Sequence, residues 1–366
     1  MTRRLRLSLG AWRRLSSKID RDRRRLRLGS NVGYWLSGLG HSLLFRLQNA
    51  SYADALRGAI PPPPIFVLGF WRSGTTLLHE LLCRDLQFGF PSTYACMNPS
   101  HFVLTEGWGS GHRGGQQQTK RPMDSMSYSW ASPQEDEFAL LALGAPSPYE
   151  SLIVPSLMRN PAALVDLCRH SSVEQKRWGE VFQRFLLLLT VQQGRRMVFK
   201  SPPHGFKLPL LLSMFPLAKY VIIERNPYEV FASNLKLWRT LLDLYAVESW
   251  SSDEIEQFVL RAYLLHEEAI AEGRTNTSTT RLAFVRYEDL VADPISQMGR
   301  LYGELDLGNY EKARASVEQY AANAAGYVRN RFTLSTAQRA RVEQSWGSLI
   351  GAKGYAWPEQ YLSVAT

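Results

Sequence analysis

The sequence has 366 residues, of which 45% are hydrophobic and 21% are charged, as in an ordinary globular enzyme. Its formal net charge is +10, but residues 1–30 contain eleven Lys and Arg against two Asp, so this segment carries +9 and the rest of the chain +1. Because the basic charge is confined to one arm and no aromatic stacking motif accompanies it, the composition argues against nucleic-acid binding. The three widely separated cysteines form neither a disulfide framework nor a metal cluster, which suits a reducing cytoplasm.

The basic N-terminal arm, residues 1–60, is predicted to be partly helical and allows two interpretations. Leucines and Trp12 stand among its arginines, so it is either a solvated tail or a segment that binds an anionic membrane through residues 1–50. The uncharged stretch from Asn31 to Phe45 is too short to span a bilayer and equally suits a buried packing helix. No signal peptide fits, so we expect a cytoplasmic protein, peripheral on the inner face of the membrane if the arm binds lipid.

Four short apolar runs are predicted to be buried strands, and helical patterns follow three of them. The strands are Ile65–Leu68, Arg196–Lys200, Ala218–Glu224 and Arg281–Tyr287; the helices are Thr75–Cys83, Leu208–Phe215, Asn226 to about Leu242, and Ser251–Gly273. This alternation predicts a three-layer α/β/α fold with a central parallel sheet. Residues 90–195 interrupt the alternation and are interpreted as a helical lobe inserted over the carboxyl ends of the strands, where open α/β sheets bind ligands.

Two helix boundaries depend on specific residues. After the third strand, Asn226 is an N-cap, Pro227 takes the first helical position, and Glu229 completes a capping box. The following helix is expected to stop at Gly273.

The first strand leads into "GFWRSGTT", Gly69–Thr76, which has the spacing of a nucleotide phosphate loop with Thr75 at the lysine position. Backbone N–H groups at the start of a helix, two threonine hydroxyls and the Arg72 side chain suit an anion. Without the lysine, and without a strand that ends in a magnesium-binding aspartate, the loop disfavours a triphosphate. A phosphosulfate carries less charge and is transferred without a metal. The alternative is a tight strand-to-helix turn with no ligand.

A second anion site is predicted after the third strand. Arg225 ends the strand and Ser233 lies two turns into the next helix, so the pair can hold a separate phosphate. Otherwise Arg225 caps the strand and Ser233 is a small packing residue. Two anion sites on neighbouring strands suit a nucleotide phosphorylated at both its 3′ and 5′ positions.

These motifs, together with "FKSPPH", "RYEDLVADP" and "GYVRNRFTLS", resemble the 3′-phosphoadenosine 5′-phosphosulfate (PAPS)-dependent sulfotransferases, in particular their bacterial branch. The resemblance implies a phosphate-loop fold over residues 61–355, with 356–366 as a tail, and transfer of a sulfuryl group from PAPS to a hydroxyl acceptor with no metal. It assigns the 5′-phosphosulfate to Arg72, Ser73, Gly74, Thr75 and Thr76. It assigns the 3′-phosphate to Arg225 and Ser233, with Arg329 and Arg331 as candidates to close over it. Otherwise these two arginines belong to an exposed basic loop. Lys200 corresponds to a lysine that contacts the transferring group, and Arg72 adds charge.

The general base is left open. Several relatives have a glutamate shortly after the loop's helix, where this chain has no acid. The candidates are His204, four residues after Lys200, and Glu135, with Glu137 next. Ser132 and Glu135 also have the spacing of a capping box, which would give Glu135 a structural role.

Two rival functions and the acceptor also stay open. A phosphate-loop small-molecule kinase would need the missing lysine and a magnesium carboxylate. An inactive scaffold that docks on membranes would have no need of intact Arg72, Lys200, Arg225 and Ser233. The acceptor is a small molecule, a lipid or a glycan, and aromatic residues of the lobe either line its site or form the lobe's core. These aromatic residues are Trp108, Tyr128, Trp130 and Tyr149.

Overall fold

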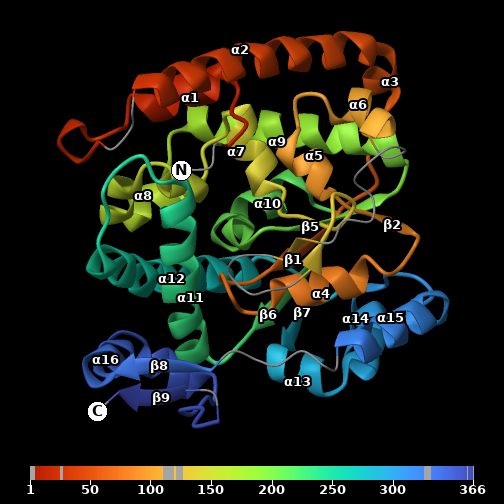
Figure 1. Cartoon of the computed structure of the whole chain (residues 1–366). Coiled ribbons are helices and arrows are strands. Elements are labelled where there is room, and N and C mark those ends of the chain that lie inside the picture. The colour runs from red at the N-terminus through yellow and green to blue at the C-terminus, as the bar shows by residue number, and fades with distance from the viewer. Residues whose placement is uncertain are drawn as a thin grey trace.

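The computed structural model describes residues 5–24, 28–109, 119–120, 127–324, 331–360 and 362–365. Its centre is a five-stranded sheet in the order β2-β5-β1-β6-β7, with every neighbouring pair parallel (Figure 1). The strands are β1 (Ile65–Leu68), β2 (Phe88–Gly89), β5 (Arg196–Lys200), β6 (Lys219–Glu224) and β7 (Leu282–Arg286). The four predicted strands are thus confirmed, and β2 is an additional, two-residue edge strand.

Helices cover both faces of this sheet, which confirms the three-layer fold. In β1, Ile65 and Val67 face one layer while Phe66 faces the other, because successive side chains of a strand point to opposite sides. The first layer contains α4 (Thr75–Leu82), α13 (Tyr287–Ala292), α14 (Pro294–Leu305) and α15 (Glu311–Ala324). The second contains α9 (Ser172–Gln193), α10 (Leu208–Met214) and part of α12 (Ser252–Thr275). Helix α9 therefore covers the sheet, although its residues fall within the interval interpreted as the lobe.

The other described residues of the interval 90–195 form short helices and turns beside the strand ends. They are α5 (Thr93–Met97), α6 (Phe102–Gly109), the hairpin β3 (Thr119–Lys120) with β4 (Ser127–Tyr128), α7 (Glu137–Leu143), η2 (Pro148–Leu152), η3 (Pro155–Arg159), α8 (Pro161–Val165) and η4 (Leu167–Arg169). A third core cluster joins this region to α11 (Pro227–Tyr245), α12 and α16 (Thr336–Ala352). Strands β8 (Phe332–Ser335) and β9 (Leu362–Ala365) form a separate parallel pair beside α16.

The first helix of the arm, α1 (Leu9–Ser16), is part of this core, so the interpretation of a solvated tail does not hold for it. Its residues Ala11, Trp12 and Leu15 are fully buried, and Trp12 stacks on Tyr34. Some of the arm's charged side chains are also used within the fold. Glu150 accepts from both Arg14 and Lys18, Glu254 pairs with Arg23, and Asn98 accepts from Arg6. The positive charge of the sequence is thus partly neutralised by acids of the body.

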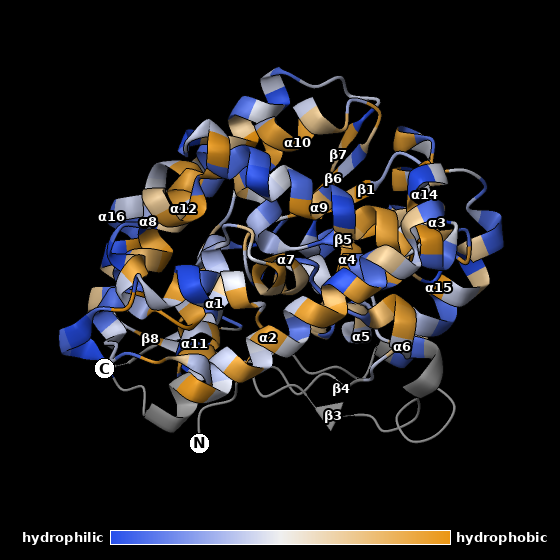
Figure 2. Ribbon diagram, turned by 90° about the horizontal axis from the view of Figure 1, so that it is seen from above, coloured by the Kyte–Doolittle hydropathy of each residue, from blue (hydrophilic) through white to orange (hydrophobic). Residues whose placement is uncertain are grey.

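The second helix of the arm, α2 (Leu28–Ser51), lies along the outside of the molecule, followed by α3 (Ala53–Gly58) (Figure 1). One side of α2 packs inward through Tyr34 and Gln48. The other side exposes an apolar stripe at helical spacing, visible in Figure 2. The stripe consists of Val32, Leu36, Leu39, Leu43 and Leu47, each about half exposed or more. Among the described residues, no helix is long and apolar enough to cross a membrane.

Two predicted helix boundaries need correction. Helix α12 continues past Gly273 to Thr275, so this glycine does not end the helix. It is buried at a place where Leu208 leaves no room for a Cβ atom, which explains why the position is a glycine. Asn226 and Pro227 do begin α11, but Glu229 does not complete a capping box. Its carboxylate accepts from Arg225, and the backbone N–H of Asn226 donates to Glu288 instead.

Candidate active site

The loop between β1 and α4 has two residues in the left-handed region. Gly74 has φ +102° and the ring of Tyr287 lies where its Cβ would be, so only glycine fits there. Arg72 has φ +69°, an unusual conformation for a residue with a side chain, which costs on the order of 1–3 kcal/mol. Neighbouring groups hold it. Arg225 Nη1 donates to the Arg72 carbonyl (3.2 Å) and Asn234 Nδ2 donates to the Trp71 carbonyl (2.8 Å).

The two predicted anion sites meet at this loop. The Nε of Arg72 donates to Ser233 Oγ at 2.9 Å, which joins the loop to α11. Arg225 lies at the end of β6, with its guanidinium 4.4 Å from the centre of the Tyr287 ring and its charge paired with Glu229. Arg72, Arg225 and Ser233 are therefore brought together.

Unpaired polar atoms at this place fit a bound anion. Ser73 Oγ and Arg225 Nε are buried and have no hydrogen-bond partner within the described chain. Buried polar groups are usually satisfied, so these two donors, one in the turn before α4 and one at the end of β6, are available to a ligand that accepts hydrogen bonds. A phosphorylated nucleotide supplies such acceptors. The described residues contain no cluster of three His, Cys, Asp or Glu that could hold a metal.

Lys200, at the carboxyl end of β5, points to the start of α4. It is 1% exposed, and its Nζ lies 2.8 Å from Glu135 Oε1 and 3.5 Å from Thr76 Oγ1. The other carboxylate oxygen of Glu135 accepts from the Tyr149 hydroxyl. The Tyr149 oxygen in turn accepts from Trp71 Nε1 at 3.1 Å, and Trp71 belongs to the phosphate loop. One continuous set of hydrogen bonds thus links the loop, the acid and the lysine.

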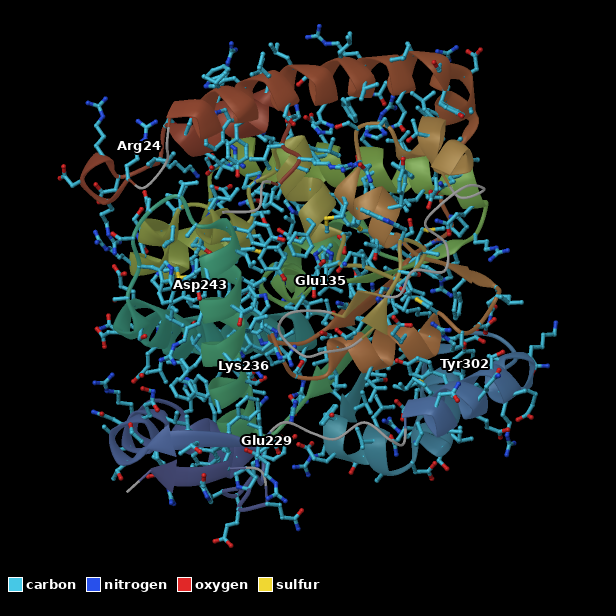
Figure 3. All side chains as sticks on the ribbon, in the orientation of Figure 1. Arg24, Glu135, Glu229, Lys236, Asp243 and Tyr302 are labelled. Carbon is cyan, nitrogen blue, oxygen red and sulfur yellow. The ribbon has the colours of Figure 1, made fainter. Side chains whose placement is uncertain are left out.

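The capping-box interpretation of Glu135 is wrong. Helix α7 begins two residues later, with Asp136 as its N-cap, and Ser132 Oγ accepts from Ser129 instead. The Glu135 side chain is free to reach Lys200 because the chain turns into the helix only after it. Figure 3 places Glu135 near the middle of the molecule.

The remaining candidate bases form a closed cluster beside this site. His204 and Glu137 are 0% exposed. His204 Nε2 lies 2.7 Å from an oxygen of Asp136 and its ring is edge-on to Phe66, while both oxygens of Glu137 accept from Lys207. Burial alone raises the pKa of Asp136, but the charge and hydrogen bond of His204 and the hydroxyl of Ser201 outweigh it, so that pKa is lowered.

Other predicted positions lie apart or outside the description. Arg329 and the side chains of Trp108 and Tyr128 lie outside the described residues, and Arg331 is exposed before β8. Trp130 is 45% exposed, whereas Tyr149 is buried at the site. Sequence reasoning missed the contributions of Trp71 and Tyr287. It gave Tyr149 and Glu229 other roles, as a lobe aromatic residue and as a capping-box acid. For Trp71 the pattern that could have found it is a large aromatic residue inside a phosphate loop.

Comparison with known proteins bears on this site. Residues 63–311 match the model of the sulfotransferase family. Over 296 residues the chain is 36% identical to the omega-hydroxy-beta-dihydromenaquinone-9 sulfotransferase Stf3 of Mycobacterium tuberculosis and of Mycobacterium bovis, covering 81% of this chain and 76% of each relative.

Solved structures agree on the fold. Sulfotransferase STF9 from Mycobacterium avium has a TM-score of 0.69 at 19% identity, covering 97% of this chain and 99% of that one. Sulfotransferase STF1 from Mycobacterium tuberculosis has a TM-score of 0.64 at 21% identity, covering 92% of each chain.

Proposed function

The chain belongs to the sulfotransferase family and transfers a sulfuryl group from PAPS to a hydroxyl acceptor, and we propose how its own residues divide this work. In the reaction the acceptor oxygen forms a bond to sulfur and the bond from sulfur to the 5′-phosphate oxygen breaks. That oxygen keeps the electron pair, and the acceptor's proton must go to a base. PAPS supplies the activated sulfuryl group; the protein supplies binding, charge and the base.

The nucleotide's two anionic ends are assigned to the two groups that meet at the loop. The 5′-phosphosulfate is held by the loop from Arg72 to Thr76, with the free Ser73 hydroxyl as a donor. Arg225 and Ser233 hold the 3′-phosphate, for which the unpaired Arg225 Nε supports the assignment. Arg329 and Arg331 remain candidates to close over it.

Lys200 and Arg72 stabilise the charge that develops on the oxygens around sulfur. An ammonium has three donors, so Lys200 can keep its bond to Glu135 while it turns others toward the reacting oxygens. Its 3.5 Å separation from Thr76 Oγ1 supports this, because it places the ammonium at the mouth of the loop.

Glu135 is proposed as the general base, and its contact with Lys200 is the observation that carries the proposal. The Glu135 side chain is 17% exposed, whereas those of Glu137 and His204 are 0% exposed. His204 is bonded to Asp136 and Glu137 to Lys207, whereas Glu135 contacts Lys200 beside the phosphate loop. We therefore assign His204 and Glu137 to the structure of the fold.

Replacement of the two neighbouring glutamates tests this assignment. Glu135→Gln should lower kcat by about 100-fold or more with an alcohol acceptor, within the usual range for loss of a general base, and by less with a phenol, which gives up its proton more readily. The variant's affinity for 3′-phosphoadenosine 5′-phosphate (PAP) should stay close to that of the wild type. Glu137→Gln is the matched control, and it should lower thermal stability more than turnover. Full activity of Glu135→Gln with alcohols would rule out this base.

The acceptor is proposed to carry its hydroxyl on an apolar, lipid-like body presented at a membrane surface. The stripe on α2 supports this, because α2 contains no Asp or Glu and its apolar face has no cover in the described chain. Gln48 on the inner side of α2 bonds the backbone at Pro99 and Val103, next to the lobe that leads to Glu135. The curated relatives are named for a hydroxylated menaquinone.

Vesicle flotation tests the membrane proposal. Leu39→Glu with Leu43→Glu should abolish binding to vesicles that contain anionic lipid, while leaving turnover of 2-naphthol unchanged. Val173→Glu alters a similarly exposed apolar residue on α9 and serves as the control. Equal flotation of the wild type, the double variant and Val173→Glu would contradict a role for α2.

A further inference from the structure

We propose that Tyr149, held by Trp71 of the phosphate loop, is the positioning residue that fixes the carboxylate of Glu135 for proton transfer. The inference rests on the proposed role of Glu135 and adds to it the means by which the nucleotide loop and the base are kept in register. Tyr149 lies in η2, in a part of the chain that the sequence motifs of the family do not mark.

The contacts around Tyr149 fix its hydroxyl from both sides. The side chain is 3% exposed, and its ring lies 4.9 Å from that of Phe138. The hydroxyl oxygen accepts from Trp71 Nε1, which has no acceptor capacity, so the hydroxyl proton is left to point at Glu135. The direction of this bond is thereby determined, with Tyr149 donating to the carboxylate.

Trp71 is itself fixed to the nucleotide site. It precedes Arg72 in the loop, it is 2% exposed, and its carbonyl accepts from Asn234 of α11. A chain of three side chains, Trp71, Tyr149 and Glu135, therefore runs from the loop to the acid. Any shift of the loop moves the base with it, and a general base loses efficiency when it is misplaced by as little as about 1 Å.

The Tyr149 hydroxyl remains a hydrogen-bond donor to the carboxylate. Burial raises the pKa of Tyr149 well above its ordinary value, and the neighbouring charge of Glu135 raises it further, so Tyr149 stays a donor throughout the working range. A bond donated to a carboxylate stabilises its charged form. Lys200 on β5 faces the same carboxylate and acts in the same direction.

The other ionisable groups around Glu135 are accounted for. Asp136 and Glu137 follow it and are paired with His204 and Lys207. Cys96 on α5 is buried, which raises the pKa of its thiol well above the ordinary value and keeps it neutral. Loss of the Tyr149 hydroxyl should thus act on Glu135 and not on these groups.

The test is Tyr149→Phe, which keeps the ring and removes the hydroxyl. With geranylgeraniol in detergent micelles, and with water as the acceptor in PAPS hydrolysis, the acidic limb of the kcat–pH profile should move up by about one pH unit, the expected effect of one charge-assisted hydrogen bond. Infrared difference spectra against Glu135→Gln should show the same shift in the titration of the carboxylate without turnover. Trp71→Phe should give a smaller shift in the same direction.

Tyr302→Phe is the matched control. Tyr302 is 2% exposed and donates to Asp85 at 2.8 Å, so the substitution removes an equivalent buried bond to a carboxylate. Figure 3 shows Tyr302 well apart from Glu135. We expect comparable loss of thermal stability in both variants but no pH shift in Tyr302→Phe.

The outcomes separate the two proposals. If Glu135→Gln keeps full turnover, the base is wrong, while the infrared titration still decides whether Tyr149 fixes the carboxylate. If Glu135→Gln is inactive and Tyr149→Phe has the wild-type limb and titration, the positioning role is wrong and the base stands.

Discussion

Two lysine–glutamate pairs connect the same two segments of this protein, yet they differ in their access to the outside. Lys200 pairs with Glu135 and Lys207 pairs with Glu137, each at 2.8 Å. In the second pair both side chains are almost completely buried, and the lysine lies over the ring of Trp178. In the first, Glu135 keeps partial exposure and Lys200 borders the phosphate loop.

The difference shows that two neighbouring glutamates can have different roles, one in the stability of the fold and one in the reaction. The buried pair, Lys207 with Glu137, has almost no contact with solvent and acts only through the stability of the fold. The partly exposed pair, Lys200 with Glu135, can also form hydrogen bonds to a substrate. The two glutamates are two positions apart, on either side of the start of α7. The break between loop and helix therefore decides which glutamate is sealed.

Breaking the sealed pair should have the largest effect. Lys207→Ala leaves the charge of Glu137 buried and unpaired, so we expect the free energy of unfolding to fall by about 3–5 kcal/mol. Urea denaturation followed by circular dichroism measures it. A double replacement, Lys207→Met with Glu137→Leu, removes both charges and should recover most of the loss. A change below about 1 kcal/mol in Lys207→Ala would mean that the pair is not sealed.

Breaking the open pair should affect turnover instead. Lys200→Ala should lower kcat by about 100-fold or more, as expected for one lost donor to transition-state charge. Its unfolding free energy should fall less than that of Lys207→Ala, because water can reach Glu135. Steady-state kinetics and urea denaturation of the two alanine variants provide the comparison. Equal loss of stability in both would remove the distinction.

The affinity for the nucleotide should not depend on either lysine–glutamate pair. Arg225→Ala and Ser233→Ala should each weaken PAP binding by about 1.5–3 kcal/mol, the worth of a charge-assisted contact. Isothermal titration calorimetry measures this, with Arg300→Ala as a control, since Arg300 forms an exposed pair with Glu304. Unchanged affinity in both variants would place the 3′-phosphate elsewhere.

The smallest expected effect is a pH dependence of stability, which comes from the buried cluster of Asp136, Glu137 and His204. The pKa of Asp136 in the folded protein lies below its ordinary value. The stability that this carboxylate contributes is therefore fully present above its pKa in the unfolded chain, about 3.9, and is lost as the pH falls through the folded pKa. Asp136→Asn should lose less stability than the wild type between pH 5 and pH 3, measured by thermal unfolding. Parallel pH curves for the two proteins would show that His204 does not hold this charge.

The sequence predicted the sheet and the loop because both rest on local patterns. The four apolar runs became strands, and the glycine spacing with Arg72 and Thr76 formed the turn into α4. His204 and Glu135 could not be separated as candidate bases, because the rings that enclose His204 come from β1 (Phe66) and from α9 (Trp178 and Phe182), outside the local sequence pattern around His204.

The interpretation of a solvated tail failed for α1 for the same reason. Its arginines suggested free charge, but their partners Glu150 and Glu254 lie far along the chain, and no local pattern indicates such pairs. In the folded chain these ion pairs neutralise part of the arm's positive charge and hold the arm against the body.

The burial of α1 has a consequence for the order of events during synthesis. Arg23 and its partner Glu254 are 231 positions apart, and Ser8 bonds the backbone of Ala142. At about 5–20 residues per second, the ribosome needs roughly 10–50 s to supply the last of these contacts. Tyr34 of α2 can cover Trp12 early, but the cover of Ala11, Trp12 and Leu15 stays incomplete until the later segments are made, and exposed apolar surface on a growing chain favours wrong associations. The packing around the N-terminal arm is thus completed well after α1 is synthesised, and the speed of translation sets the length of that delay.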